Sequence, residues 1–120
     1  MIKYHIIFSV KYRKSLLNLV GDDIKRLMIN ISNKYNFDVC EMEIDNNHIH
    51  FLIDSIPTLS PSMIIRVLKQ QSTRDIWKLH YVLLKKHFWK EKTFWADGYF
   101  VSSIGDASIS TIKNYIKNQG

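Results

Sequence analysis

The stretch His48-Ile49-His50-Phe51-Leu52-Ile53 decides how the chain is expected to fold. It is a short apolar run rich in β-branched and aromatic residues, which predicts a strand. Alternate side chains of a strand share one face, so Ile49 and Phe51 are expected to enter the core. His48 and His50 are then expected to point together toward the opposite, open face of the sheet.

Three other stretches predict further strands around this run. Residues 3–10 alternate along the chain and predict a first strand. Residues 38–44 predict a second strand, which a three-residue polar link joins to the histidine-containing strand, as in a hairpin. Residues 94–103 are strand-like but are interrupted by Asp97 and Gly98. The strands therefore come as one, then a hairpin pair, then one more.

Apolar residues at helical spacing lie between and after these strands. Residues 22–33 predict a first helix, with Gly21 as punctuation in front of it. Ser60 as a cap, followed by a proline at the first helical position, predicts a second helix over residues 61–77. A final helix is expected from about Ser108 onward.

Taken together, the elements have the order β-α-β-β-α-β-α. This order predicts an α+β fold: a ferredoxin-like antiparallel sheet with helices on one face, plus a C-terminal helix. Residues 77–92, rich in aromatic residues and lysines, predict no single element. A length of 120 residues suits a single domain, which is expected to span residues 1–120.

Composition narrows the class of protein and of partner. Seventeen Lys and Arg against 11 Asp and Glu give a formal net charge of +6, which favours a polyanion such as nucleic acid. No apolar run has the length of a membrane span, and the first residues lack the layout of a signal peptide. A single cysteine, Cys40, excludes an internal disulfide. We therefore expect a soluble, cytoplasmic protein with no membrane partner.

Four residues make up the candidate reactive site. His48 and His50 share a strand face, while Tyr115 and Gln119 lie four residues apart on one face of the final helix. Two imidazoles and a carboxamide oxygen would form a mixed nitrogen and oxygen site that suits Mg²⁺ or Mn²⁺ acting as a Lewis acid. The residues alone also permit surface histidines, a glutamine that solvates a helix end and a tyrosine packed at a helix edge.

Basic side chains gather in three places and are candidates for binding DNA. They follow the first strand, lie on the polar face of the second helix and alternate with aromatic rings in the segment after it. The predicted DNA-binding residues are Lys11, Arg13, Lys14, Arg66, Lys69, Arg74, Lys85 and Lys86. Each cluster by itself could also be an ordinary solvated face.

The motifs occur together in an order that resembles a known family. They are Tyr4-His5 to Lys11-Tyr12-Arg13, the run from His48 to Ile53, Phe94-Trp95 with the run from Asp97 to Ser102, and the run from Ile112 to Gln119. In this combination the chain resembles the single-tyrosine HUH transposases of IS200-like insertion sequences. The resemblance covers nearly the whole chain.

The resemblance implies a dimeric enzyme that cuts and rejoins single-stranded DNA at the ends of its element, where it recognises subterminal hairpins. It implies Tyr115 as the nucleophile that takes the 5′ phosphate, and His48, His50 and Gln119 as the metal ligands. It also implies that the tyrosine helix of one subunit serves the histidines of its partner.

Two features depart from the family pattern. Asn47 stands where these proteins usually carry aspartate, and the chain ends at Gly120 where relatives commonly continue. Two other functions therefore remain open at this point. One is a nicking enzyme of the replication or conjugation type, which shares the histidine pair. The other is an inactive or domesticated relative that binds hairpins without cutting them.

Overall fold

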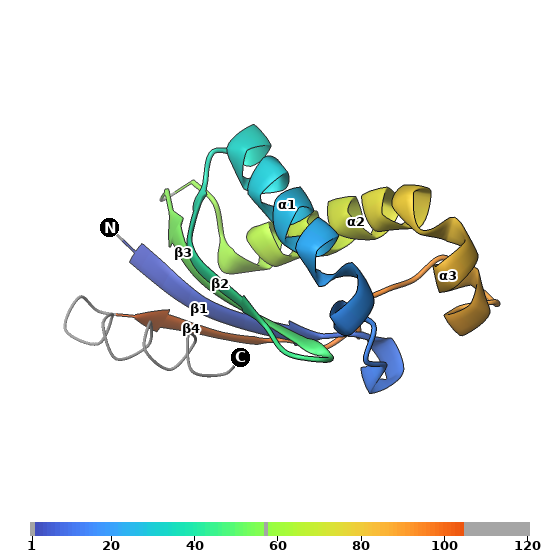
Figure 1. Cartoon of the computed structure of the whole chain (residues 1–120). Coiled ribbons are helices and arrows are strands. Elements are labelled where there is room, and N and C mark those ends of the chain that lie inside the picture. Colours follow the sequence, from blue (N-terminus) through green and yellow to red (C-terminus); the bar gives the residue numbers. More distant parts are fainter. Residues whose placement is uncertain (1, 57, 105–120) are drawn as a thin grey trace.

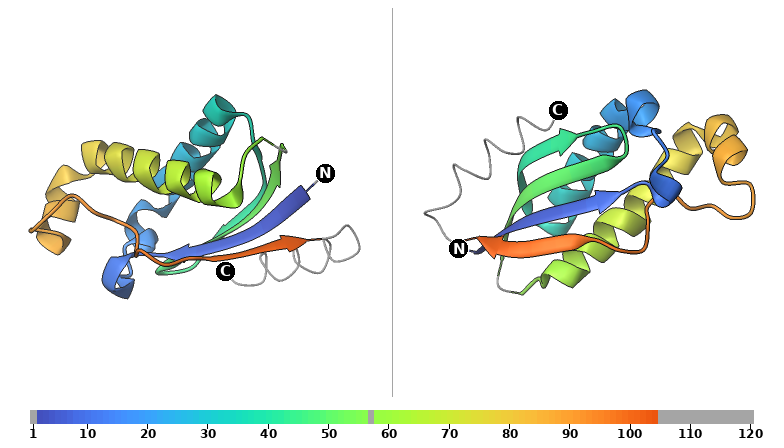
Figure 2. Two further views of the ribbon diagram at one scale, coloured as in Figure 1. Left: turned by 180° about the vertical axis from the view of Figure 1, so that it is seen from behind. Right: turned by 90° about the horizontal axis from the view of Figure 1, so that it is seen from below.

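The alternating segments form one four-stranded antiparallel sheet, seen edge-on in Figure 1. The computed structural model describes residues 2–56 and 58–104. The strands are β1 (Ile2–Ser9), β2 (Asp38–Ile44), β3 (His48–Ser55) and β4 (Phe100–Ile104). They lie side by side in the order β2-β3-β1-β4 (Figure 2), the arrangement of a ferredoxin-like fold. The predicted α+β fold is therefore confirmed.

Two long helices, α1 (Leu17–Tyr35) and α2 (Pro61–Leu79), cover one face of the sheet (Figure 1). The start of α2 is as predicted, because the backbone N–H of Met63 donates to Ser60 Oγ at 3.2 Å. A short 3-10 helix, η1 (Lys11–Arg13), follows β1. The region without a sequence prediction contains the end of α2 and a further helix, α3 (Tyr81–His87).

The core between sheet and helices fixes the register of the two central strands. Ile6 faces Phe51 and Phe8 faces Ile49 across the antiparallel β1–β3 pair, and all four side chains are buried. Burying each such side chain stabilises the fold by about 1.5–3 kcal/mol. A slip by one residue would turn this apolar set outward and carry the neighbouring histidines into the core. The apolar alternation therefore determines the face on which the histidines lie.

The first helix begins five residues earlier than predicted, at Leu17 rather than at residue 22. Gly21 lies inside the helix and is buried, so its interpretation as punctuation was wrong. A side chain at this position would meet Ile44 of β2, which lies 3.5 Å from the place of a Cβ atom. This distance is an ordinary van der Waals contact, so the packing of α1 on β2 does not itself require a glycine here. The helix ends at Tyr35, and its C-cap Asn36 adopts the left-handed conformation with φ 62°.

The predicted strand over residues 94–103 divides into two parts. Trp95 forms an isolated antiparallel bridge with Val10, and β4 begins only at Phe100. Between them the backbone leaves the sheet, and the Lys69 ammonium donates to the carbonyl oxygens of Ala96, Asp97 and Gly98 at 2.7, 3.2 and 3.1 Å. A side chain from α2 thus replaces the missing strand partners.

The final helix expected from Ser108 lies outside the described residues. Among the helices that are described, none is both long enough and apolar enough to cross a membrane.

Candidate functional site

His48 and His50 lie next to each other on the face of β3 that points away from α1 and α2, as predicted. Their ring centroids are 6.5 Å apart. His50 pairs with Ile7 of β1 and with Glu43 of β2, so it occupies the middle of the sheet and is only 4% exposed. His48 begins the strand and is more accessible. The pair therefore combines one buried and one half-buried imidazole.

A third imidazole, that of His5, joins them from β1. Its ring stacks on that of His50 with the centroids 6.2 Å apart and an angle of 23° between the planes, and it is 6% exposed. His5 was not among the predicted site residues. Its signal lay in the alternation of residues 3–10, which places His5 on the same face once β1 is paired with β3.

Burial determines the charge of the two inner histidines. It lowers the pKa of His50, and the nearby His5 ring lowers it further. Burial likewise lowers the pKa of His5. Both rings are therefore neutral at pH 7, and neutral imidazole is the form that binds a metal ion. Within residues 2–56 and 58–104, no group of three His, Cys, Asp or Glu side chains is arranged to hold a metal.

Arg13 contacts the outer histidine directly. Its Nη1 atom lies 3.0 Å from His48 Nε2. A guanidinium can only donate, so Nε2 accepts and the ring carries its proton on Nδ1. Arg13 and the preceding Tyr12 have φ angles of 53° and 61°, in the left-handed region that non-glycine residues seldom adopt. This unusual backbone aims the guanidinium back toward the strand.

Asn47 supports the same turn. Its Nδ2 group donates to the carbonyl oxygen of Arg13 at 3.3 Å. An ionised aspartate at this position could not donate this hydrogen bond, because a carboxylate only accepts. Asparagine at position 47 is thus matched to the conformation of the Arg13 turn in this chain.

A cavity of about 400 Å³ opens beside His48. The end of β1, Arg13, His48 and part of the segment 96–100 line it. Tyr99 and Phe100 contribute half-exposed rings, and the Phe100 ring meets the edge of His5 with centroids 5.8 Å apart. The cavity is therefore an open recess with an imidazole, a guanidinium and two aromatic rings around it.

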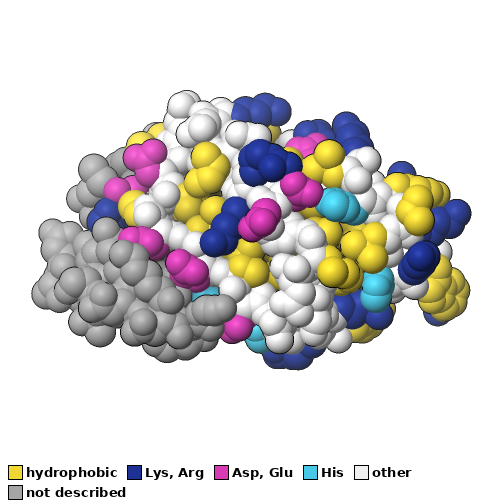
Figure 3. Space-filling model, in the orientation of Figure 1, with side chains coloured by type: hydrophobic (Ala, Val, Ile, Leu, Met, Phe, Trp, Pro, Cys, Tyr) yellow, Lys and Arg dark blue, Asp and Glu magenta, His cyan; other side chains and the backbone are white. Residues whose placement is uncertain are grey.

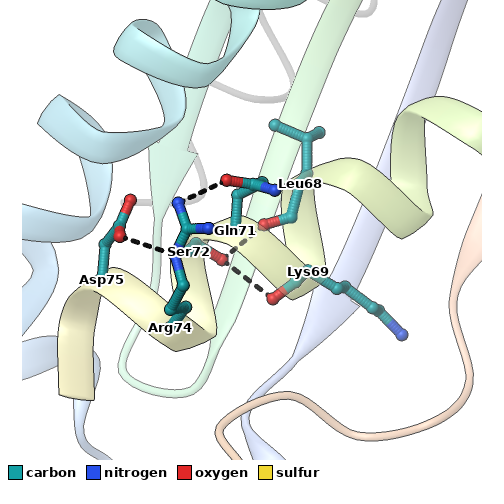
Figure 4. A network of polar contacts seen from close by, with 6 residues as sticks. All are labelled: Leu68, Lys69, Gln71, Ser72, Arg74 and Asp75. Carbon is teal, nitrogen blue, oxygen red and sulfur yellow. Dashed lines mark hydrogen bonds and ion pairs between the residues drawn. The ribbon is translucent and has the colours of Figure 1, made fainter.

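The predicted DNA-binding residues have different surroundings. Lys11 forms an ion pair with Glu91 at 3.0 Å, and Arg74 donates to Gln71 at 2.6 Å and to Asp75 at 3.2 Å on its own helix (Figure 4). Arg13 lies at His48. The other predicted residues outside α2 are Lys14, Lys85 and Lys86. On the face shown in Figure 3, basic and hydrophobic side chains are interleaved at the end of the molecule that contains α3.

Lys69 differs from the other predicted residues. Figure 4 shows its side chain leaving α2 and extending away from the helix, and its ammonium contacts the 96–98 backbone described above. Burial lowers the pKa of Lys69, and the charge of Asp97 partly opposes this effect. Arg66, one turn earlier on α2, is exposed to solvent. DNA binding by these eight residues stays a prediction.

Tyr115 and Gln119 lie outside the described residues. The structure therefore brings together His48, His50, His5 and Arg13. The roles assigned to Tyr115 and Gln119 stay predictions.

Known proteins are similar to this chain over nearly its whole length. The family described as "Transposase IS200 like" matches residues 1–119. The chain is 28% identical over 119 residues to the ISDra2 transposase TnpA of Deinococcus radiodurans, with 98% of this chain and 84% of the relative covered. It is 30% identical over 122 residues to the transposase for insertion sequence element IS200 of Salmonella typhimurium, with 98% and 76% covered.

Solved structures agree with this similarity. A transposase structure from Deinococcus radiodurans matches with a TM-score of 0.77 and 25% identity, over 98% of this chain and 89% of that one. The structure of a REP-associated tyrosine transposase bound to a REP hairpin matches with a TM-score of 0.69 and 15% identity, over 95% and 63%. The second likeness concerns the fold alone.

Proposed function

Since the chain belongs to the IS200-like transposase family and is a transposase, we propose that it cleaves and rejoins single-stranded DNA through a 5′-phosphotyrosine formed on Tyr115. The single observation that carries the proposal is the pair of adjacent histidines on the open face of the sheet, with the inner one held neutral by burial.

The proposed step balances without an external energy source. The Tyr115 phenol loses its proton and its oxygen forms a new bond to the phosphorus atom. The bond from phosphorus to the 3′ oxygen breaks, and that oxygen takes up a proton as a free 3′-OH. One phosphodiester replaces another, so the reverse attack by a 3′-OH can rejoin the strands.

The chain offers suitable ligands for the divalent metal that the family implies. His48 and His50 would supply imidazole nitrogens and Gln119 a carboxamide oxygen, a set that accommodates Mg²⁺ or Mn²⁺. When bound, the metal would act as a Lewis acid on a phosphoryl oxygen. His50 can present a neutral ring at pH 7 without prior loss of a proton, because burial has already lowered its pKa.

We further propose that the substrate carries a hairpin and that two chains form the enzyme, with the tyrosine of one serving the histidines of the other. A structural neighbour of the same fold is a tyrosine transposase bound to a REP hairpin. The net charge of +6 of the present chain suits such a partner.

The test uses the DNA that flanks the gene. Imperfect palindromes near the ends of the element are synthesised as labelled single-stranded hairpins and incubated with the protein and Mn²⁺. A denaturation-resistant protein–DNA adduct is expected for the native chain and not for Tyr115→Phe, which keeps the ring and loses the nucleophilic oxygen. Hairpin binding without an adduct in the native chain would instead identify an inactive relative.

A further inference from the structure

A second and larger cavity is lined by the C-terminal half of α2 and by the segment that leads from α3 to β4. Figure 2 shows the course of these two segments. The volume of the cavity is about 870 Å³, within the range of sites that hold small organic ligands. It is separate from the histidine site, and the proposed chemistry does not use it.

Three aromatic residues are part of its lining. Trp77 and Trp95 are almost fully buried, and their indole N–H groups already donate to Thr93 O at 2.8 Å and Ser72 Oγ at 2.9 Å. They therefore form part of the apolar wall of the cavity, and neither indole N–H group is available to a ligand. Tyr81 at the edge is 46% exposed and lies against Trp77, with ring centroids 6.0 Å apart. A planar ligand could stack on this exposed ring.

The charges at the rim are mostly positive. Arg74 and Lys78 come from α2 and Lys92 from the opposite side, and all three are exposed. Lys85 and Lys92 both lie over the Tyr81 ring, with Nζ 5.4 and 5.8 Å from the centroid. Among the described residues that line the cavity, Asp97 is the acidic one. The rim therefore favours an anionic ligand.

The cavity is connected to the histidine site through one short segment. Ala96 lines both the larger cavity and the recess beside His48. Lys69 fixes this segment to α2 through its bonds to three successive carbonyl oxygens. A DNA strand that lies at His48 can thus pass over the 96–98 segment into the larger cavity.

We propose that this cavity binds one unpaired nucleobase of the single-stranded DNA substrate, away from the cleavage point. The base stacks on Tyr81, and the phosphates on either side of it contact Arg74, Lys78 and Lys92. Rings combined with cations are how proteins hold single strands without reading their sequence. Gln70 and Thr73 line the same cavity and can hydrogen-bond to the edge of the base. This inference rests on the proposed function, because it names where part of the same substrate lies.

The test measures binding in the Tyr115→Phe background, so that cleavage does not interfere. The probe is a fluorescein-labelled oligothymidylate of about 12 nucleotides, within the range of single-strand site sizes. We expect Tyr81→Leu to weaken binding about tenfold, as loss of one stacked base would. Lys92→Ala should weaken it by a smaller factor and reduce its salt dependence.

The chain supplies a matched control on α1. Lys34 lies over the ring of Tyr35, with Nζ 5.6 Å from the centroid, in the same relation as Lys92 and Tyr81 but away from both cavities. Lys34→Ala and Tyr35→Leu make the same chemical changes and should leave oligothymidylate binding unchanged. Thermal unfolding of each variant verifies that it is folded.

A second probe, an abasic oligomer of the same length, tests the role of the base. On the abasic oligomer, the parent Tyr115→Phe and the variant that also carries Tyr81→Leu should bind with the same affinity. The proposal is overturned if Tyr81→Leu and Lys92→Ala bind oligothymidylate like the parent, if the Tyr81 effect persists on the abasic oligomer, or if free thymidine monophosphate binds as tightly as the oligomer. Adduct formation by the native chain is scored separately, so failure of the chemistry is distinguished from failure of the cavity.

Discussion

Arg13 Nη1 donates to His48 Nε2 across 3.0 Å, and so it occupies the lone pair of that ring nitrogen. A metal ion needs the same lone pair if His48 is to bind it through Nε2. Arginine is also a strong partner for phosphate. A DNA phosphate that attracts Arg13 would release His48 for the metal, and the two binding events would then favour each other.

Arg13→Ala should therefore strengthen Mn²⁺ binding in the absence of DNA. Removing a competing hydrogen bond of about 1 kcal/mol corresponds to a gain of about fivefold in affinity, measured by isothermal titration calorimetry. Lys14→Ala makes a similar change of charge next to it and is the control. Unchanged or weaker binding of Mn²⁺ by Arg13→Ala would show that the guanidinium does not compete.

The buried histidines should make stability depend on pH. Burial lowers the pKa of His5 and of His50 below the ordinary 6.5, so just below pH 6.5 the unfolded chain binds more protons than the folded one. The two neutral rings should hence make their full contribution to the free energy of unfolding above pH 6.5. This contribution should decrease as the pH falls toward the folded pKa values.

Urea unfolding in EDTA, between about pH 7.5 and pH 5.5, measures this effect. The double variant His5→Gln, His50→Gln should show a smaller decrease over the same range than the parent. Equal pH dependence in both proteins would mean that these two rings are not the source.

Lys69→Met should destabilise the fold by about 2 kcal/mol, because three backbone carbonyl groups lose a charged donor. Methionine keeps most of the aliphatic stem. The exposed Arg66 on the same helix provides the control, and Arg66→Met should change the urea midpoint little. If Lys69→Met and Arg66→Met lost equal stability, the hydrogen bonds from Lys69 to residues 96–98 would not contribute measurably to the stability of the fold.

Shared active sites predict complementation between inactive chains. Tyr115→Phe and His50→Ala should each fail to form the adduct alone. In a mixed dimer, a shared site can pair intact histidines from one chain with intact Tyr115 from the other, so mixing should restore activity. A mixture that stays inactive despite verified subunit exchange and hairpin binding would indicate that each chain uses its own tyrosine.

Local patterns were sufficient for the main features of the fold. The alternation around Ile49 and Phe51 predicted both the strand and the open face on which His48 and His50 lie, since the strand period of two permits only one assignment once the apolar face is buried. Gly21 was misinterpreted because a helical glycine packed against a strand and a glycine that ends a loop look alike in sequence.

The contacts that were missed join residues far apart in the chain. His5 enters the site only through the pairing of β1 with β3, and Lys69 finds its partners 27 to 29 residues later. The hydrogen bond between Arg13 and His48 depends on the positive φ angles of Tyr12 and Arg13. Nothing in the local sequence predicts these angles. Such relations depend on tertiary structure and not on periodicity.

The most direct measurement is to identify the amino acid that carries DNA after cleavage. The adduct formed on a hairpin oligonucleotide is digested with protease and nuclease and analysed by tandem mass spectrometry. A nucleotide joined through its 5′ phosphate to the Tyr115 side chain, with a free 3′-OH on the released fragment, is the predicted result. A nucleotide on another residue, or cleavage that leaves a free 5′ phosphate and unmodified Tyr115, would contradict it.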